Sequence, residues 1–160
     1  MPEVRSAKWS PREERLISEF CAKEFPDAPV RLRVRLGPYL SALDPSQLSD
    51  RELRMVGSWR RWADAVVVQP DRLTVIEAAI RPAVGKISQL EYYLRLVGST
   101  PELLEFAGRP VHGLLLFAIQ DPLLEQLARE KGFQVRYYRP PWVDEYLTQI
   151  YSREGRPVRS

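Results

Sequence analysis

Two acidic residues are the strongest candidates for chemistry in this sequence. Asp64 opens the apolar run DAVVVQ, and Glu77 lies inside a second run, TVIEAAI. A Pro-Asp dipeptide separates the two runs and is typical of a tight turn. We therefore predict a hairpin with strands at about 64–69 and 72–80, which must position both carboxylates.

The register of this hairpin decides where the carboxylates lie. If Gln69 pairs with Arg72 across a two-residue turn, Asp64 lies directly opposite Glu77, with their Cβ atoms roughly 4.5–5.5 Å apart. Two like charges in that position destabilise the sheet unless a positive charge lies between them, and a divalent cation held by carboxylate oxygens supplies one. The alternative is that Asp64 caps a strand in solvent while Glu77 pairs with Arg81. The apolar surroundings of Glu77 count against it, because a buried charge without a partner is costly.

The next predicted helix, 84–97, adds polar groups to the candidate site. Lys86, Gln89 and Tyr93 are spaced by three and four residues, so they share one face of this helix. An apolar stripe on the helix, Ile87, Leu90, Leu94 and Val97, faces the core instead.

These motifs together resemble the PD-(D/E)xK nuclease superfamily. The chain has an Asp at the start of one hairpin strand, a Glu on the other strand, and Gln-x-x-x-Tyr on the following helix. The last element is similar to the RecB-like branch of that family. The resemblance covers about residues 30–138 and the helix before them. It implies an α/β fold with a restriction-endonuclease-like αβββαβ core, in which helices flank a mixed sheet of four or five strands, followed by a C-terminal helix-strand-helix.

The resemblance also implies roles for individual residues. Asp64, Glu77 and the backbone carbonyl of Ala78 would bind Mg²⁺ or Mn²⁺. Gln89 and Tyr93 would steady the site and the strand to be cut. A carboxylate of the first helix, Glu14 or Glu19, would complete the site.

Ala79 departs from the family pattern, because it stands where the family has its catalytic lysine. Losing such a group costs on the order of 10²–10⁴ in rate, so the resemblance implies a site with compromised catalysis, whether by natural degeneration or by engineering. Lys86 or Arg81 are the two conceivable substitutes. Arginine does not readily act as a base, and Lys86 also fits an ordinary solvated residue.

Several arginines are candidates for contacts with DNA. Arg60, Arg61, Arg81 and the neighbouring Lys86 flank the hairpin that carries the carboxylates, and the net charge of the chain is +3. Arg31, Arg33 and Arg35 alternate with apolar residues along the predicted strand VRLRVRLG. This stripe fits either a phosphate-tracking surface or an ordinary solvated face of a strand.

The remaining elements complete a single α/β domain over residues 1–160. The segment Ser10-Pro11-Arg12-Glu13 is a capping box that opens a helix to about Phe25. Ser49 or Asp50 is predicted to cap a short helix through Trp59. Strands at 111–119 and 133–138, a helix at 122–132 and a last helix from Pro140 follow, and the basic tail 152–160 is expected to be mobile.

Composition limits the classes of function. A single Cys and a single His exclude an internal disulfide and a Cys/His metal cluster, and we expect a reducing, cytoplasmic location or a phage particle. No apolar run reaches the roughly 20 residues of a membrane span, so no membrane partner is expected. The absence of Asn fits a heat-exposed source.

Three functions remain open at this point. The first is a metal-dependent phosphodiesterase that cuts DNA. The second is a pseudo-nuclease that binds nucleic acid without cutting it. The third is a structural protein, for example a phage component, that forms homo-oligomers or binds other partners of the particle.

Overall fold

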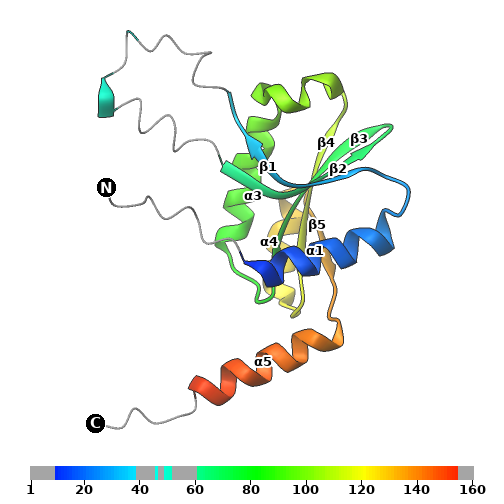
Figure 1. Cartoon of the computed structure of the whole chain (residues 1–160), viewed down its shortest axis with the longest axis vertical. Coiled ribbons are helices and arrows are strands. Elements are labelled where there is room, and N and C mark those ends of the chain that lie inside the picture. Colours follow the sequence, from blue (N-terminus) through cyan, green and yellow to red (C-terminus); the bar gives the residue numbers. More distant parts are fainter. Residues whose placement is uncertain (1–9, 39–45, 47–48, 52–60, 155–160) are drawn as a thin grey trace.

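A five-stranded mixed sheet forms the centre of the protein (Figure 1). The computed structural model describes residues 10–38, 46, 49–51 and 61–154. The strands lie in the order of the sequence: β1 (Val30–Leu36), β2 (Arg61–Gln69), β3 (Arg72–Ala79), β4 (Val111–Phe117) and β5 (Gln134–Tyr137). The β1–β2 and β2–β3 pairs are antiparallel, whereas β3–β4 and β4–β5 are parallel. The predicted α/β class and mixed sheet are confirmed.

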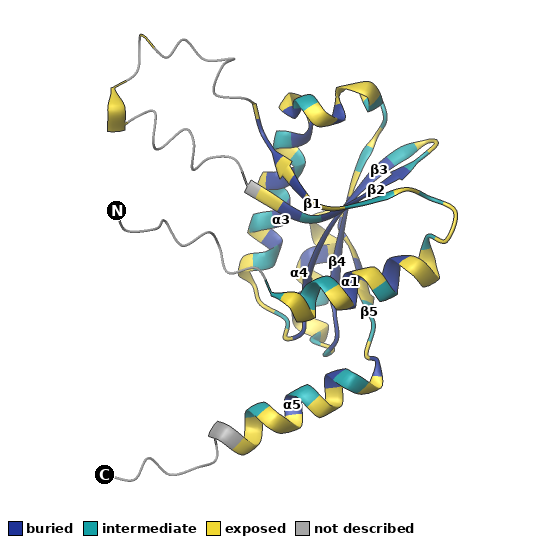
Figure 2. Cartoon of the chain, viewed as in Figure 1, coloured by how far each residue is buried: buried dark blue, intermediate teal, exposed yellow. Residues whose placement is uncertain are grey.

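Helices cover both faces of the sheet. The apolar cluster on one face joins the sheet to α3 (Gly85–Leu96), α4 (Pro122–Glu130) and the 3₁₀ helices η3 (Val97–Ser99) and η4 (Pro101–Phe106). The cluster on the other face joins it to α1 (Pro11–Glu24) and α5 (Pro141–Glu154). Strands β3 and β4 are therefore buried along most of their length (Figure 2), as expected for strands with helices on both sides.

Local sequence signals explain where the helices begin. The Ser10 hydroxyl accepts a hydrogen bond from the Glu13 N–H at the start of α1, and Asp121 caps α4 in the same way. Residues 152–154, the start of the predicted tail, belong to α5. Residues 155–160 and most of the short helix predicted to run through Trp59 lie outside the described residues. None of the described helices is long and apolar enough to cross a membrane.

The edge strand β1 departs from the predicted alternation. Its register with β2 is continuous, but Arg33 has φ 50°, a rare value for a residue other than glycine. Val30 packs toward α1, whereas Val34 beyond Arg33 belongs to the cluster under α3. The predicted stripe of three arginines is therefore wrong: Arg31 turns to η4, with Nη2 2.7 Å from a carboxylate oxygen of Glu105.

Candidate metal and nuclease site

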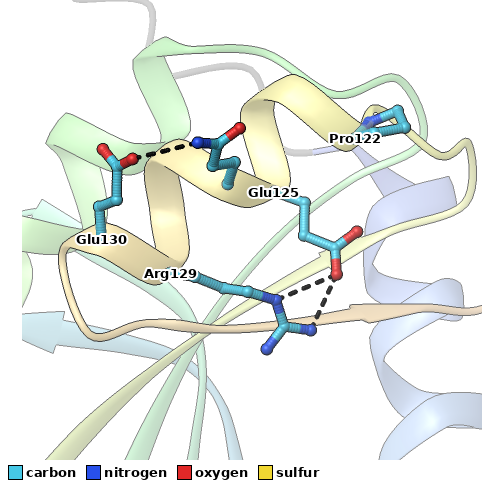
Figure 3. A pocket seen from close by; sticks show the side chains of 5 residues that line it. Pro122, Glu125, Arg129 and Glu130 are labelled. Atoms are coloured by element: carbon cyan, nitrogen blue, oxygen red, sulfur yellow. Dashed lines mark hydrogen bonds and ion pairs between the residues drawn. The ribbon is translucent and has the colours of Figure 1, made fainter.

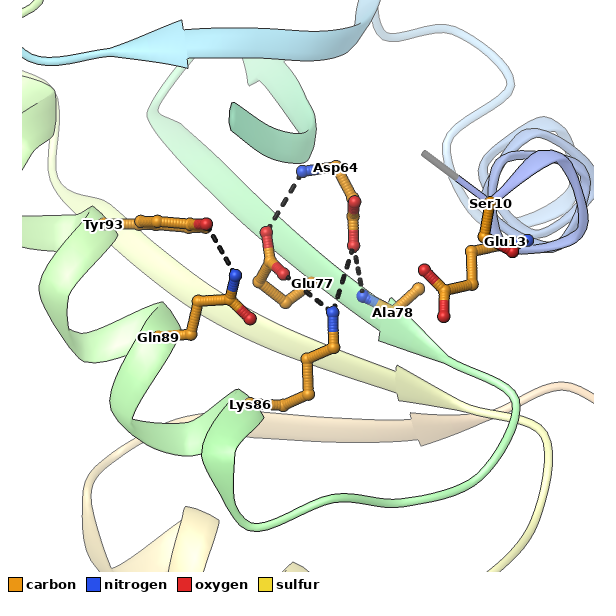
Figure 4. Close-up of polar contacts among 8 residues, drawn as sticks. All are labelled: Ser10, Glu13, Asp64, Glu77, Ala78, Lys86, Gln89 and Tyr93. Carbon is orange, nitrogen blue, oxygen red and sulfur yellow. Dashed lines mark hydrogen bonds and ion pairs between the residues drawn. The ribbon is translucent and has the colours of Figure 1, made fainter. Parts of the chain in front are cut away.

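The regular backbone pairing of the hairpin stops before Asp64. Regular pairing of β2 with β3 runs from Gln69–Arg72 to Ala65–Ile76, as the turn predicts. At the next position the side chains bridge the strands: the Asp64 N–H donates to Glu77 Oε1 at 3.1 Å, and the Ala78 N–H donates to Asp64 Oδ2 at 2.9 Å (Figure 4). Each carboxylate is thus held by a backbone N–H of the opposite strand, and the structure brings Asp64 and Glu77 together.

Lys86 supplies the positive charge that this pair requires. It is the second residue of α3, and its Nζ lies 3.3 Å from Glu77 Oε2 and 3.9 Å from Asp64 Oδ2 (Figure 4). The lysine side chain is 20% exposed, so it is not the ordinary solvated residue considered above. Glu77 pairs with Lys86 rather than Arg81, whose guanidinium lies on the exposed surface over the ring of Tyr151.

Burial makes the charges of this group interdependent. Glu77 is 1% exposed, and burial followed by the charge of Asp64 raises its pKa to about 8. Burial alone would lower the pKa of Lys86, but the charges of Glu77, Asp64 and Glu13 outweigh it and raise that pKa. These shifts favour a protonated Lys86 at neutral pH and make Glu77 easier to protonate in the metal-free protein than an exposed carboxylate.

Glu13 is the residue that the sequence reasoning missed. The pKa of Glu13 is raised by burial, lowered by the charge of Lys86 and raised by the charge of Asp64. The carboxylate of Glu13 therefore interacts electrostatically with both of these site residues. Figure 4 shows Glu13 on one side of the Asp64–Glu77–Lys86 group and Gln89 and Tyr93 on the other.

Of the two carboxylates predicted to complete the site, Glu14 stays a prediction, whereas Glu19 lies elsewhere. Glu19 is held elsewhere, where it accepts hydrogen bonds from Trp142 Nε1 at 2.9 Å and from the Tyr138 hydroxyl at 3.2 Å. The available signal for Glu13 was its place in the capping box, which fixes it in the first turn of α1.

Gln89 and Tyr93 lie along α3 beyond Lys86. Gln89 Nε2 donates to the Tyr93 hydroxyl at 2.7 Å, and the Tyr93 ring is buried in the cluster between α3 and the sheet. The buried ring fixes the hydroxyl, and the hydroxyl in turn orients the amide of Gln89 beside the carboxylates.

The other predicted site residues are placed as follows. Ala79 is buried in the apolar cluster under α3, and Ala78 contributes its N–H to Asp64. Arg61 begins β2 opposite Leu36, and Arg60 lies outside the described residues.

The chemistry of this donor set fits a hard divalent cation. Mg²⁺ commonly keeps several waters and uses one or two protein carboxylates, which Asp64 and Glu77 provide. The lysine ammonium held between them shows that positive charge is accommodated at this position. Within the described part of the chain, no three His, Cys, Asp or Glu side chains gather closely enough to form a complete protein cage. A cation here would depend on water or substrate oxygens as well.

A surface hollow lies along α4, and the carboxylates are not among its lining residues. Its lining residues are Pro122, Glu125, Gln126, Arg129 and Glu130 (Figure 3). Arg129 pairs with Glu125, and Gln126 donates to Glu130, so these polar groups satisfy one another within the helix.

Three solved structures are similar to most of this chain. A repair endonuclease from Pyrococcus abyssi aligns with a TM-score of 0.43 and 18% identity, over 86% of this chain and 50% of that one. EndoMS in complex with double-stranded DNA aligns with a TM-score of 0.48 and 15% identity, over 87% of this chain and 49% of that one. EndoMS in its apo form aligns with a TM-score of 0.46 and 18% identity, over 86% of this chain and 49% of that one.

The chain therefore spans about half the length of these proteins, and similarities of this size do not establish a shared activity. No protein-family model and no curated protein matches the sequence.

Proposed function

We propose that this chain is a PD-(D/E)xK-type, metal-dependent DNA nuclease domain in which Lys86 replaces the lysine missing at Ala79. The observation that carries the proposal is the position of Lys86 Nζ, 3.3 Å from Glu77 and 3.9 Å from Asp64. A positive charge from α3 thereby occupies the surroundings where the family's lysine would act from β3. The Gln-x-x-x-Tyr pair on the same helix supports the RecB-like branch.

Some of the side chains would bind the metal ion, and others would stabilise charge on the phosphate or position the DNA. Asp64 and Glu77 would hold Mg²⁺ or Mn²⁺, with the Ala78 carbonyl as a further ligand; when bound, such a cation polarises phosphate oxygens and activates water. Lys86 is protonated at neutral pH, so it stabilises negative charge that develops on the phosphate rather than acting as a base. Gln89, oriented by Tyr93, would position the DNA strand or the water, and Arg60, Arg61 and Arg81 would contact the DNA backbone.

A second candidate is a non-catalytic domain that binds DNA or serves as a structural component, for example of a phage particle. The observation that favours it is that Lys86 already neutralises the carboxylates without a metal, while position 79 holds only a buried methyl group. A protein that no longer cuts would retain this ion pair for stability.

A cleavage assay separates the two candidates. End-labelled single- and double-stranded DNA is incubated with Mn²⁺ and the unmodified chain, Asp64→Asn, Lys86→Met or Ala79→Lys. We expect cleavage by the unmodified chain, none by Asp64→Asn, and a rate lowered by on the order of 10²–10⁴ for Lys86→Met. Lys131→Met is the matched control, because Lys131 pairs with Glu91 on the surface and its loss should leave the rate unchanged.

Other outcomes are equally informative. Cleavage by Ala79→Lys alone would mean that the metal site is intact and that Lys86 does not replace the missing group. If no variant cuts, but the chain binds DNA with an affinity that falls as salt increases, the second candidate is correct.

A further inference from the structure

A tryptophan and two arginines form an exposed cluster on β1 and β2 that the proposed chemistry does not use. Trp62 is 46% exposed. The guanidinium carbons of Arg33 and Arg35 lie 5.4 Å and 5.9 Å from the centre of its ring, and both arginines are exposed. We call these three residues the Arg-Trp cluster.

The unusual backbone of Arg33 separates this cluster from Arg31. Without the change of face at Arg33, all three arginines of β1 would alternate onto one face. With φ 50° at Arg33, Arg31 turns to η4, while Arg33 and Arg35 lie with Trp62 on the opposite face from Val34 and Ala63. Arg33 is the one non-glycine residue with positive φ among those described. Such strained positions concentrate at functional sites.

The cluster lies next to the carboxylates. Arg35 pairs directly with Trp62, and the flanking pairs Leu32–Ala65 and Val34–Ala63 place Arg33 opposite Asp64. Trp62 precedes Asp64 by two residues, which corresponds to about 7 Å along a strand. The regular pairing of β2 with β3 stops before Asp64, and Glu13 of α1 interacts with Asp64 from the face of the sheet that carries the Arg-Trp cluster. A polymer bound at Asp64 and Glu77 would extend along that side of the site to the cluster.

The chemistry of the cluster matches a single-stranded nucleic acid. An exposed aromatic ring stacks on any base, and guanidinium groups beside it bind the negatively charged backbone. Stacking on Trp62 requires a base that is not paired within a duplex. We propose that the Arg-Trp cluster binds an unpaired nucleotide beside the phosphate to be cut, with the base on Trp62 and phosphates on Arg33 and Arg35. This inference rests on the proposed DNA nuclease function and adds a preference for unpaired DNA.

Binding measurements test the cluster separately from catalysis. Fluorescein-labelled single-stranded and duplex 15-mers are titrated with the full chain in Ca²⁺, and a gel checks that the strand stays intact. For the single strand we expect Trp62→Leu to lower the affinity by about 5- to 100-fold, whereas Trp62→Phe, which keeps a stacking ring, changes it less than about threefold. Arg33→Gln with Arg35→Gln should reduce the slope of log affinity against log salt by about 1 to 2. Arg95→Gln removes an exposed charge from α3 and serves as the control.

Crosslinking of the unmodified chain removes any dependence on variants that fold poorly. A single strand containing 5-iodouracil is irradiated in the complex and the protein is digested with trypsin. Residues 62–72 form one tryptic peptide in which Trp62 is the only aromatic residue. We expect a crosslink to this peptide, reduced when the strand is in a duplex.

Equal affinities for the unmodified chain and Trp62→Leu, or crosslinks confined to other peptides, would overturn the inference. If the chain also cut DNA with Mn²⁺, the proposed function would remain. A chain that binds neither single-stranded nor duplex DNA would overturn both.

Discussion

At the scale of single residues, the burial of Glu77 dominates the electrostatics of the candidate site. Glu77 is almost fully buried, and from the described residues it accepts one backbone N–H and one lysine contact. Desolvation of a carboxylate is costly, and these partners offset it only in part, which is why the pKa of Glu77 rises to about 8. A bound cation would therefore compete with protonation of Glu77.

The raised pKa of Glu77 makes stability depend on pH in a predictable direction. The folded pKa of Glu77, about 8, lies above its unfolded value of 4.5. Its contribution to stability is therefore complete below about pH 4.5 and is lost as the pH rises through about 8. Between about pH 5 and pH 9, we expect the free energy of unfolding of the metal-free chain to fall relative to that of Glu77→Gln, by at most roughly 1.4 kcal/mol per pH unit. Urea titrations in EDTA at several pH values measure the difference.

An exposed carboxylate provides the control. The pKa of Glu91 is lowered by its hydrogen bond to Lys131 and by the charge of that lysine, so Glu91→Gln should give a curve parallel to that of the unmodified chain above about pH 5. If Glu77→Gln also gave a parallel curve, Glu77 would be ionised throughout this range and the buried proton would not exist.

At the scale of elements, Thr100 joins β1 to the end of α3. Its buried hydroxyl donates to the Leu96 carbonyl at 2.7 Å and accepts from the Gly37 N–H at 2.9 Å. Thr100→Val keeps the shape but removes the acceptor of the Gly37 N–H, so we expect a loss of about 1–3 kcal/mol in the free energy of unfolding. Ser99 donates to the same carbonyl from an exposed position, and Ser99→Ala should cost less than about 0.5 kcal/mol. Equal effects in chemical denaturation would show that Thr100 does not connect the two elements.

Gly113 sets the distance between α3 and the sheet. A Cβ at this position of β4 would lie 3.0 Å from side-chain carbons of both Leu90 and Phe133. Gly113→Ala should therefore cost about 1–3 kcal/mol through overpacking and shift α3, which carries Lys86. Gly85→Ala is the control, since nothing lies within 4 Å of its Cβ and α3 should tolerate it or gain stability. A Gly113→Ala chain as stable as its parent would mean that Leu90 and Phe133 can move apart freely.

At the scale of the whole molecule, periodicity was sufficient to predict the helices and strands. The strand of alternating residues at 30–36, the hairpin and the three later helices appear within a few residues of the predicted bounds. Each has a local cause, such as Pro at a helix start or the Pro-Asp turn. The change of face at Arg33 could not be predicted, because arginine carries no preference for positive φ.

The site was predictable where it depends on local geometry and not where it depends on tertiary packing. The proximity of Asp64 and Glu77 follows from one turn, and the shared face of Lys86, Gln89 and Tyr93 follows from one helix. The position of Glu13 depends on how α1 crosses the sheet, which no local pattern encodes. The bridging hydrogen bonds at Asp64 likewise arise because β2 leaves the ladder there.

The last prediction concerns metal binding and the stability of the whole chain. A cation that binds only the folded state at 100 times its dissociation constant adds about 2.7 kcal/mol, which corresponds to a rise in Tm of roughly 5–10 °C for a chain of this size. We expect Mn²⁺ to produce this rise, more at about pH 8 than at pH 6 because Glu77 must lose its proton. Asp64→Asn should abolish the rise and Glu91→Gln should keep it, as measured by thermal melting.

Lys86 makes this prediction sharper, because its ammonium and the cation compete for the same carboxylate oxygens. Lys86→Met removes the competitor, so the same Mn²⁺ concentration should raise its Tm further than that of the unmodified chain, although the metal-free variant starts from a lower Tm. A single set of melting curves thus tests the donor set and the role of Lys86 without relying on cleavage. An Mn²⁺ shift that is the same in Asp64→Asn as in the unmodified chain would show that the cation binds elsewhere.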